Sequence, residues 1–500
     1  MTTESLIESP LARLTEEQIE ELGREFDAIH DDVYAELGER DRKYITSMID
    51  MHRRLAVMAR VLLLASRFKP AWVAGTTANS LAKILENMEI GHNVLHGQWD
   101  WMNDPQIHST TWDWDTASTS EAWKHSHNYV HHTYTNIRGK DKDLGYEIMR
   151  IDPHQKWHPV YLLQPFYNIL LMSFFEWGVA FHDLDFEAIK TGEKTKEQVA
   201  REMKGIAGKA RSQIVKDYIA WPLISALAVG AVKVAIEPRR VSRRDRVLAR
   251  LRGAAPGRSN GRREVAKEVA TRVVEGGART FVATAKANAT ANIVRNVWSY
   301  AIIFCGHFPD QTYTFSQKEV EDETRGGWYV RQLSGAANIE GSAFFHVASG
   351  NLGYQVEHHL FPDMPSTRYG EIAPRVREIC ERYGLPYNTG PLGRQLGMVH
   401  RTILRLAFPG GKPRPKPGPF RSEDSGHEVA APTGGSRNGA STNGSRTTGA
   451  RVNGSGPSGS PVGSRQELYA EARRLDVAGR SRMSKEELRS AVERASTADS

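Results

Sequence analysis

The sequence predicts an all-α fold, an integral-membrane helical bundle of about four spanning helices with a histidine-rich cap on the cytosolic side. Three observations support this fold class. Histidines concentrate in three short clusters, and an arginine-rich run follows the third of four apolar stretches. None of the four is a clean run of the ~20 uncharged residues that a simple spanning helix needs. They lie at about residues 55–88, 160–182, 216–236 and 289–306.

The composition suits a protein that meets anionic partners. The formal net charge is +7 and the pI is about 9.2, which fits phospholipid, a phosphorylated thioester carrier or nucleic acid. The mean hydropathy of −0.49 reflects a long polar tail that dilutes the apolar stretches. Cys305 and Cys380 could pair at most once, so we expect a reducing cytosolic face and a fold that disulfides do not build. The N-terminus lacks a basic start followed by an apolar run, so no secretory signal is expected.

Residues 1–50 are polar and acidic, and the helical spacing of apolar residues from Leu14 to Phe26 predicts N-terminal cap helices there. Residues 51–408 contain all four apolar stretches and form the predicted membrane domain. The first stretch carries charged residues and Pro70 between two apolar halves. It is therefore either a tight helical hairpin or a single broken span.

Three further segments are predicted from their composition. Residues 237–275 form an arginine-rich insertion, because 237–263 hold ten arginines against two acids, and the positive-inside rule places such a run in the cytosol. Residues 409–464 are rich in Gly, Ser, Pro and Asn, so they cannot bury enough apolar surface to fold and form a disordered linker. Residues 465–500 have the pattern of two short helices and form a small helical module.

Seven of the eighteen histidines fall into the three clusters. In GHNVLHGQWD, His92 and His96 stand at i and i+4, which places both imidazoles on one helical face, close enough to share a metal ion. In WKHSHNYVHHTYTN, His127 and His131 repeat this spacing, while His132 lies ~100° further round the helix.

The third cluster, GYQVEHHLFP, contains a second doublet, His358 and His359, with Gln355 three residues before it. Adjacent histidines do not easily chelate one metal from a regular helix, but they can point at two metals side by side, so the doublets predict a dinuclear site. Asp100 and Glu357 lie near the clusters and could accept hydrogen bonds from imidazole N–H groups. We leave open whether His125 is a ligand. Eight other histidines are interpreted as ordinary surface or core residues, namely His30, His52, His108, His154, His158, His182, His400 and His427.

These motifs, together with FEWGVAFHDL, ANIVRNVWSYAIIFCGHFP and QLSGAANIEG, resemble the membrane fatty-acid desaturases, and most of all the actinobacterial acyl-CoA (stearoyl-CoA Δ9-type) desaturases. The resemblance covers about residues 50–400 and implies two non-haem iron ions with eight or nine nitrogen ligands. Gln355 stands where relatives have histidine or glutamine, so it is either a ligand or a hydrogen-bond partner. By motif match, with His307 of CGHFP as the additional ligand outside the clusters, the metal ligands are His92, His96, His127, His131, His132, His307, His358 and His359.

The resemblance also implies a reaction, the insertion of a cis double bond at Δ9 of a long-chain acyl-CoA with O₂ as co-substrate. Reducing O₂ to water takes four electrons, two from the acyl chain and two from outside. The chain has no GxGxxG loop in a strand–helix setting, no CxxC cluster and no HPGG signature. We therefore expect a separate electron donor, and the resemblance suggests an NADPH-dependent flavin and iron–sulfur oxidoreductase.

All histidine clusters must meet on one side of the membrane, so the chain between the second and third clusters must cross it an even number of times. We predict that 160–182 and 216–236 cross as a pair, and that 289–306 lies in the cap or the lipid interface and delivers His307. The result is a multi-pass protein of the plasma (inner) membrane whose active site faces the cytosol.

Two other functions fit parts of the pattern. A di-iron acyl or alkane hydroxylase or ketolase uses similar clusters, although YQVEHHLFP favours a desaturase. A membrane zinc protein is a more remote alternative, because HExxH is absent and zinc sites rarely need two histidine doublets.

The C-terminal segment ELYAEARRLDVAGRSRMSKEELRSAV resembles the small helical N-terminal module of transcription termination factor Rho and related SAP-like motifs. The resemblance implies contact with nucleic acid or with a protein, and the basic linker before it favours non-specific nucleic-acid contact.

Overall fold

The structure is a computed structural model that describes residues 9–251, 260–411, 414–421, 489–491 and 494. The chain divides into two compact units, Met1–Glu428 and Val429–Ser500. The first unit is almost entirely helical, as expected. Most of the predicted linker 409–464 and of the predicted module 465–500 lies outside the described residues, so both stay predictions.

The N-terminal helix α1 (Glu16–Ala35) begins with the capping box formed by Thr15 and Gln18. Its apolar face, which includes Leu22 and Phe26, is fully buried. That face packs on α13 (Arg325–Gly335) and α16 (Tyr369–Tyr383), and so it covers the part of the fold that bears the third histidine cluster.

The first apolar stretch forms a tight helical hairpin of α2 (Glu39–Leu64) and α3 (Lys69–Ile84). Pro70 lies in the first turn of α3, where its missing N–H costs no helical hydrogen bond. This confirms the hairpin and excludes a single broken span.

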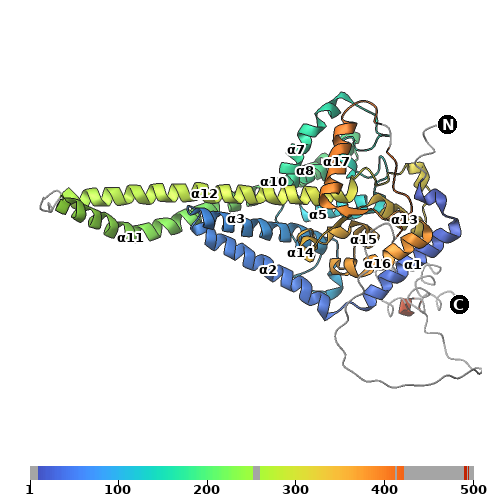
Figure 1. The fold of residues 1–500 in the computed structure, drawn as a ribbon, viewed down its shortest axis with the longest axis horizontal. Coiled ribbons are helices and arrows are strands. Elements are labelled where there is room, and N and C mark those ends of the chain that lie inside the picture. The colour runs from blue at the N-terminus through green and yellow to red at the C-terminus, as the bar shows by residue number, and fades with distance from the viewer. Residues whose placement is uncertain (1–8, 252–259, 412–413, 422–488, 492–493, 495–500) are drawn as a thin grey trace, which may run out of the picture. The chain divides into compact units, whose positions relative to one another are not determined.

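A second and longer hairpin consists of α11 (Trp221–Leu251) and α12 (Asn260–His307), and it extends from the same side of the cap as α2 and α3 (Figure 1). The 48 residues of α12 correspond to ~70 Å of helix. Before α11, α10 (Lys196–Ile214) leads into the π-helix η8 (Val215–Ala220). Among the described residues, one helical run, Lys196–Ile236, is long and apolar enough to cross a membrane by length and composition.

Polar side chains join the two hairpins inside the bundle. The side-chain oxygen of Asn288 on α12 accepts hydrogen bonds from Arg60 (2.8 Å) and Asn79 (3.1 Å). Its amide nitrogen donates to the backbone oxygen of Asp217. The Asp217 carboxylate pairs with Lys83 at 2.8 Å. Four helical segments are therefore fixed at one level along α12.

The prediction that 160–182 pairs with 216–236 as one of two spanning helices is wrong. The segment folds as η7 (Pro159–Leu163), α7 (Gln164–Ser173) and α8 (Phe175–His182), with a break at Phe174 (φ −120°, ψ 35°). None of these reaches the ~20 residues of a span. The helix that pairs with 216–236 is α12, and its C-terminal part contains 289–306. That stretch is therefore not a separate segment of the cap or the interface, although it does deliver His307.

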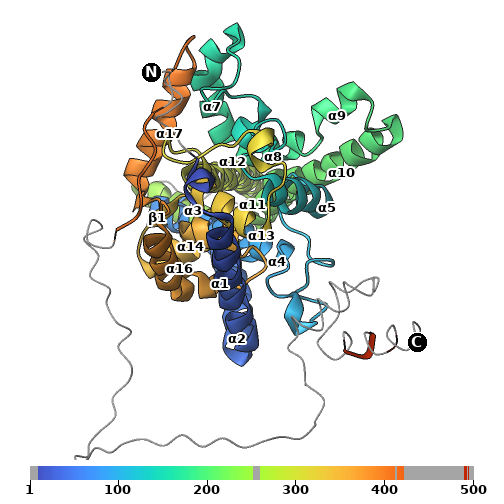
Figure 2. The ribbon, with the colours of Figure 1, turned by 90° about the vertical axis from the view of Figure 1, so that its right-hand side faces the viewer.

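Buried polar groups explain why 160–182 stays in the cap. The Gln164 amide exchanges hydrogen bonds with the backbone of Arg150. Asn168 accepts from the Tyr300 hydroxyl at 2.8 Å, and Glu176 forms an ion pair with Arg295. Helix α17 (Leu392–Leu406) packs beside α7 in both views (Figures 1 and 2). Polar side chains that already have partners in the cap hold this segment there.

The chain remains in contact with the cap beyond the boundary predicted at residue 408. Arg150 donates to the backbone oxygen of Gly410, Lys416 donates to that of Thr312, and the Phe420 N–H donates to Leu385. The predicted linker therefore starts later than residue 409, because residues 414–421 find backbone partners on the first unit.

The remaining elements of the cap are short. A parallel pair of three-residue strands, β1 (Asn338–Glu340) and β2 (Thr389–Pro391), pairs Asn338 with Thr389. The other helical elements are η2 (Pro10–Arg13), η3 (Leu85–His92), α4 (Asn93–Leu95), η4 (Asp100–Met102), α5 (Ser120–Trp123), η5 (Lys124–His131), α6 (His132–Tyr134), η6 (Leu144–Glu147), α9 (Phe186–Thr191), η9 (Gln317–Val320), α14 (Ala343–Ala348), η10 (Leu352–Tyr354), α15 (Gln355–Leu360) and η11 (Ser366–Arg368).

Candidate metal centre

The first two histidine clusters lie on or beside π-helices. His92 ends η3, and His96 follows α4, with ring centroids 4.5 Å apart. His127 and His131 lie on η5, which ends where α6 begins at His132. π-Turns are rare and often occur at functional sites.

The third cluster and His307 complete the set from the other half of the chain. His358 and His359 lie on α15, and His307 is the last residue of α12. All three are buried. The structure thus brings together all eight histidines that the motifs predict, although they come from segments up to 267 positions apart (His92 to His359).

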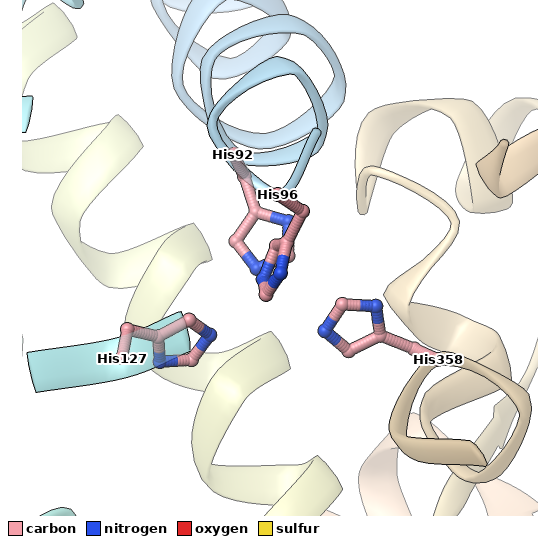
Figure 3. Close-up of side chains that lie close together, drawn as sticks. All are labelled: His92, His96, His127 and His358. Carbon is pink, nitrogen blue, oxygen red and sulfur yellow. The ribbon is translucent and has the colours of Figure 1, made fainter. Parts of the chain in front are cut away.

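The eight histidines form two adjoining groups. In one group, ring nitrogens of His92, His96, His127 and His358 lie within 4.8 Å of one another, and these four rings converge in Figure 3. In the other group they come from His131, His307 and His359. His132 lies between the groups, with its ring centroid 4.8 Å from that of His96 and 4.6 Å from that of His359.

The inner nitrogens fit metal ions. A buried polar atom without a hydrogen-bond partner destabilises the folded state, and a bound metal ion is a partner for the lone pair of an imidazole nitrogen. Within the described part of the chain, the nitrogens without a hydrogen-bond partner include both ring nitrogens of His132 and Nε2 of His96, His127, His131, His358 and His359.

The outer nitrogens of these rings are held by neighbouring side chains. Outer partners of this kind fix the tautomer and the orientation of a ligating imidazole. The accepting oxygens and their distances from Nδ1 are Asn93 for His92 (3.0 Å), Asp143 for His127 (3.3 Å), Asp141 for His131 (3.0 Å), Tyr369 for His358 (3.2 Å) and Gln332 for His359 (2.9 Å).

Sequence reasoning missed this outer ring of side chains. Asp143 also accepts a 2.9 Å hydrogen bond from His182, a residue interpreted above as ordinary. Asp141 and Asp143 follow the second cluster by about ten residues in GKDKD, and that proximity was the one available signal. Asp100 instead bonds Ser109, and Glu357 bonds Asn338 and Tyr387, among the described contacts.

Gln355 lies beside a histidine of the second group. Its amide nitrogen is 3.1 Å from His307 Nε2, and His307 Nδ1 has no hydrogen-bond partner within the described residues. Gln355 is thus a hydrogen-bond partner of His307. His125, by contrast, is exposed and stacks on Tyr129, outside both groups.

Burial keeps most of these imidazoles neutral, which is the state that binds metals. It lowers the pKa of His92 to about 3 and holds those of His96, His358 and His359 well below the usual value. Burial also opposes charge on His131, but the nearby carboxylates of Asp141 and Asp143 outweigh it and raise the pKa of that histidine.

Similarity to known proteins agrees with this geometry. The family model for "Fatty acid desaturase" matches residues 70–236 and 215–391. The chain belongs to the fatty acid desaturase family. It is 41% identical over 398 residues to "NADPH-dependent stearoyl-CoA 9-desaturase" from two strains of Mycobacterium tuberculosis, a match that covers 80% of this chain and 82% of each relative.

A shorter region is similar to a human desaturase. "Fatty acid desaturase 3" of Homo sapiens is 35% identical over 113 residues, which is 23% of this chain and 24% of that protein. No solved structure matches the chain.

Two cavities of this desaturase are lined in part by histidines of the centre. One of about 50 Å³, whose exposed wall is mainly apolar, is lined by His92 together with Met88, Trp123, Phe175 and Ile303. The other, of about 60 Å³, is lined by His307 and is described below. The two histidine groups therefore face different surroundings.

Proposed function

We propose that this desaturase inserts a cis double bond at Δ9 of a long-chain saturated acyl-CoA, using O₂ and two electrons from outside the chain. The observation that supports this most is the pair of adjoining histidine groups with inward, unpartnered nitrogens. The relatives named as stearoyl-CoA 9-desaturases supply the chain length, the thioester and the position.

In this proposal the two groups hold two iron ions. His92, His96, His127 and His358 bind one, His131, His307 and His359 bind the other, and His132 lies between them. Bound iron with O₂ would supply the oxidising power that an unactivated methylene pair requires. The protein orients the imidazoles through Asp141, Asp143, Gln332 and Tyr369.

The apolar cavity at His92 is the proposed place of the acyl chain. Its apolar walls bind methylene groups and exclude water, and they hold the reacting carbons beside one histidine group. A hydroxylase with this site would bind its substrate in the same cavity, so the identity of the product distinguishes the two functions.

The electron donor is proposed to be a separate NADPH-dependent flavin and iron–sulfur oxidoreductase. The relatives are named as NADPH-dependent, and the chain contains none of the nucleotide or cysteine motifs that such a donor needs. Contact of the C-terminal module 465–500 with nucleic acid or a protein stays a separate and weaker proposal.

We further propose that the hairpins α2–α3 and α11–α12 give four membrane crossings. Exposed apolar side chains on their outer surfaces include Val57 and Val61 on α2, Leu227 on α11, and Val282 on α12. In this arrangement the described parts of the 237–275 insertion, 237–251 and 260–275, lie at the end of α11–α12 remote from His307. The cap faces the cytosol, where NADPH is available, so the insertion faces the opposite side, contrary to its predicted cytosolic location.

Single cysteines at Gly139 and at the exposed Ala266 of α12 test the topology with a membrane-impermeant maleimide on intact cells. We expect labelling at position 266 and not at 139 until the cells are opened. Labelling of neither or both positions in intact cells would refute the crossing of α11–α12.

The reaction is tested by expressing the chain with its reductase and mapping double bonds in the acyl products. We expect Δ9 monounsaturated C16–C18 chains and about two iron ions per chain by metal analysis. A hydroxylated product would favour the hydroxylase alternative, and zinc in place of iron would refute the oxidative chemistry.

A further inference from the structure

The polar cavity beside His307 is unlike the apolar cavity at His92. Most of the residues that line it are polar or charged, and they include Asp152, His154, Asp310, Thr312, Thr402 and Lys416, although apolar atoms make up the larger part of its exposed wall. Its volume of about 60 Å³ exceeds the ~10–15 Å³ that a single buried water molecule needs. The cavity therefore provides a polar path to one histidine group.

Two buried side-chain atoms that line this cavity have no hydrogen-bond partner within the described residues. They are Oδ2 of Asp152, which is 1% exposed, and Oγ1 of Thr402, which is 4% exposed. The nearest cation to Asp152 Oδ2 in an ion pair is Arg138 at 3.9 Å, too far for a hydrogen bond. Buried polar atoms in a polar cavity of this size are satisfied by ordered water.

The outer end of the cavity is built by charged groups rather than by an apolar barrier. Lys416, on the segment that continues beyond α17, donates to the backbone oxygens of Asp310 and Thr312. The Asp310 carboxylate pairs with Arg401 and with Arg414. The Arg401 and Arg414 side chains are about half exposed, so these charged groups connect the cavity to the protein surface.

Desaturation needs a path of this kind. If the proposed function holds, the balanced reaction is R–CH₂–CH₂–R′ + O₂ + 2e⁻ + 2H⁺ → R–CH=CH–R′ + 2H₂O. The two electrons come from the external donor, and the two protons come from the solvent. The acyl chain fills the apolar cavity during turnover, so protons and water need another way in and out.

We propose that the cavity lined by Asp152, Thr402 and Lys416 is a water-filled route through which protons reach the His307 side of the metal centre and product water leaves. The two histidine groups then have different duties. The group at His92 faces the acyl chain, and the group at His307 faces the solvent.

Hydroxyl-radical labelling of the purified protein, read by mass spectrometry, tests the water in the cavity without reference to turnover. Phe308 lines the polar cavity and Phe175 lines the apolar one, and both are buried (5% and 3% exposed). We expect several-fold faster oxidation of Phe308. Equal rates would overturn the proposal.

Two variants test the route in turnover. Asp152→Asn removes the carboxylate at nearly constant size, and Thr402→Val removes the hydroxyl. We expect Asp152→Asn to lower kcat about tenfold, to raise the solvent isotope effect in D₂O, and to leave the KM for acyl-CoA and the iron content unchanged. Electrons consumed per double bond should rise above the stoichiometric two.

Thr280→Val is the matched control, because Thr280 is a buried threonine on α12 that bonds Gly276 and lies 27 residues before His307. It should behave as the wild type. An unchanged kcat and isotope effect in both Asp152→Asn and Thr402→Val would overturn the proposal, as would equal effects in the control. Failure of the wild type to form double bonds would refute the proposed function instead, since the labelling result does not depend on it.

Discussion

Replacing Asp143 by asparagine tests whether the outer carboxylates hold the metal centre together. Asp143 accepts hydrogen bonds from His127 Nδ1 at 3.3 Å and from His182 Nε2 at 2.9 Å, and it lies 3.7 Å from His131 Nδ1. His127 and His131 belong to different groups, so this carboxylate orients a side chain of one group by a hydrogen bond and lies close to a side chain of the other. Asparagine keeps the size but has one acceptor oxygen and no charge.

The expected loss follows from these contacts. Removing an outer partner of a metal ligand costs about 10–100-fold in metal affinity, or about 1.4–2.8 kcal/mol at ~1.4 kcal/mol per factor of ten. Asp143 serves both groups, so we expect a value near the upper end. Chelator competition against purified protein, followed as metal per chain, measures the loss.

Asp183→Asn is the control for this measurement. Asp183 is also buried and follows His182 directly, but among the described residues its carboxylate accepts hydrogen bonds from Ser118 and Ser126 rather than from a cluster histidine. It should keep its metal affinity. If Asp143→Asn stays within twofold of the wild type, or if Asp183→Asn loses as much, the carboxylate does not orient the ligands.

Three further predictions concern stability and the C-terminal unit. Burial lowers the pKa of His30, but the adjacent Asp363 carboxylate outweighs it and raises that pKa above 6.5, while the pKa of Asp363 falls below 3.8. The pair therefore stabilises the fold fully only between pH 3.8 and 6.5, and its contribution is lost as pH rises through the raised pKa of His30. In thermal melts, His30→Gln should cost up to ~1 kcal/mol in that window and less at higher pH; a deficit independent of pH would contradict this. Gly350→Ala should destabilise by ~1–3 kcal/mol, because Gly350 has φ +70° and a Cβ there would lie 2.4 Å from the Met88 oxygen; an unchanged melting temperature would show that this contact relaxes. Deleting residues 422–500 should leave desaturation intact, since all eight histidines of the centre and the Phe420 N–H that donates to Leu385 lie before the deletion; loss of turnover with normal iron content would assign the C-terminal unit a role in the reaction.

The histidines that the motifs single out lie together in the structure, and they can be found from the sequence because their information is local. The doublets His131–His132 and His358–His359 argue for two metals by their geometry alone, and the structure places one member of the first doublet between the two groups. The motif resemblance added His307, which lies outside every cluster and is delivered by the end of α12.

What the sequence could not show depends on tertiary contacts. The stretch 160–182 is apolar enough to suggest a span, but its fate is decided by Asn168 and Glu176, whose partners Tyr300 and Arg295 lie more than 100 residues away. The outer acceptors come from loops and from distant helices, and no periodicity or short motif marks such contacts.

The continuity of α12 has a consequence for the accuracy of the metal centre. The position of a ligand on the last residue of a helix depends on the position of the whole helix, and a shift of the helix by one residue along its axis moves that ligand by ~1.5 Å. Metal–nitrogen distances tolerate only ~0.2 Å. The contacts of Asn288 with Arg60, Asn79 and the backbone of Asp217 set the axial register of this helix, 19 residues from His307. The polar groups inside the bundle thus fix the position of His307 relative to the other seven histidines, although they lie far from the metal centre.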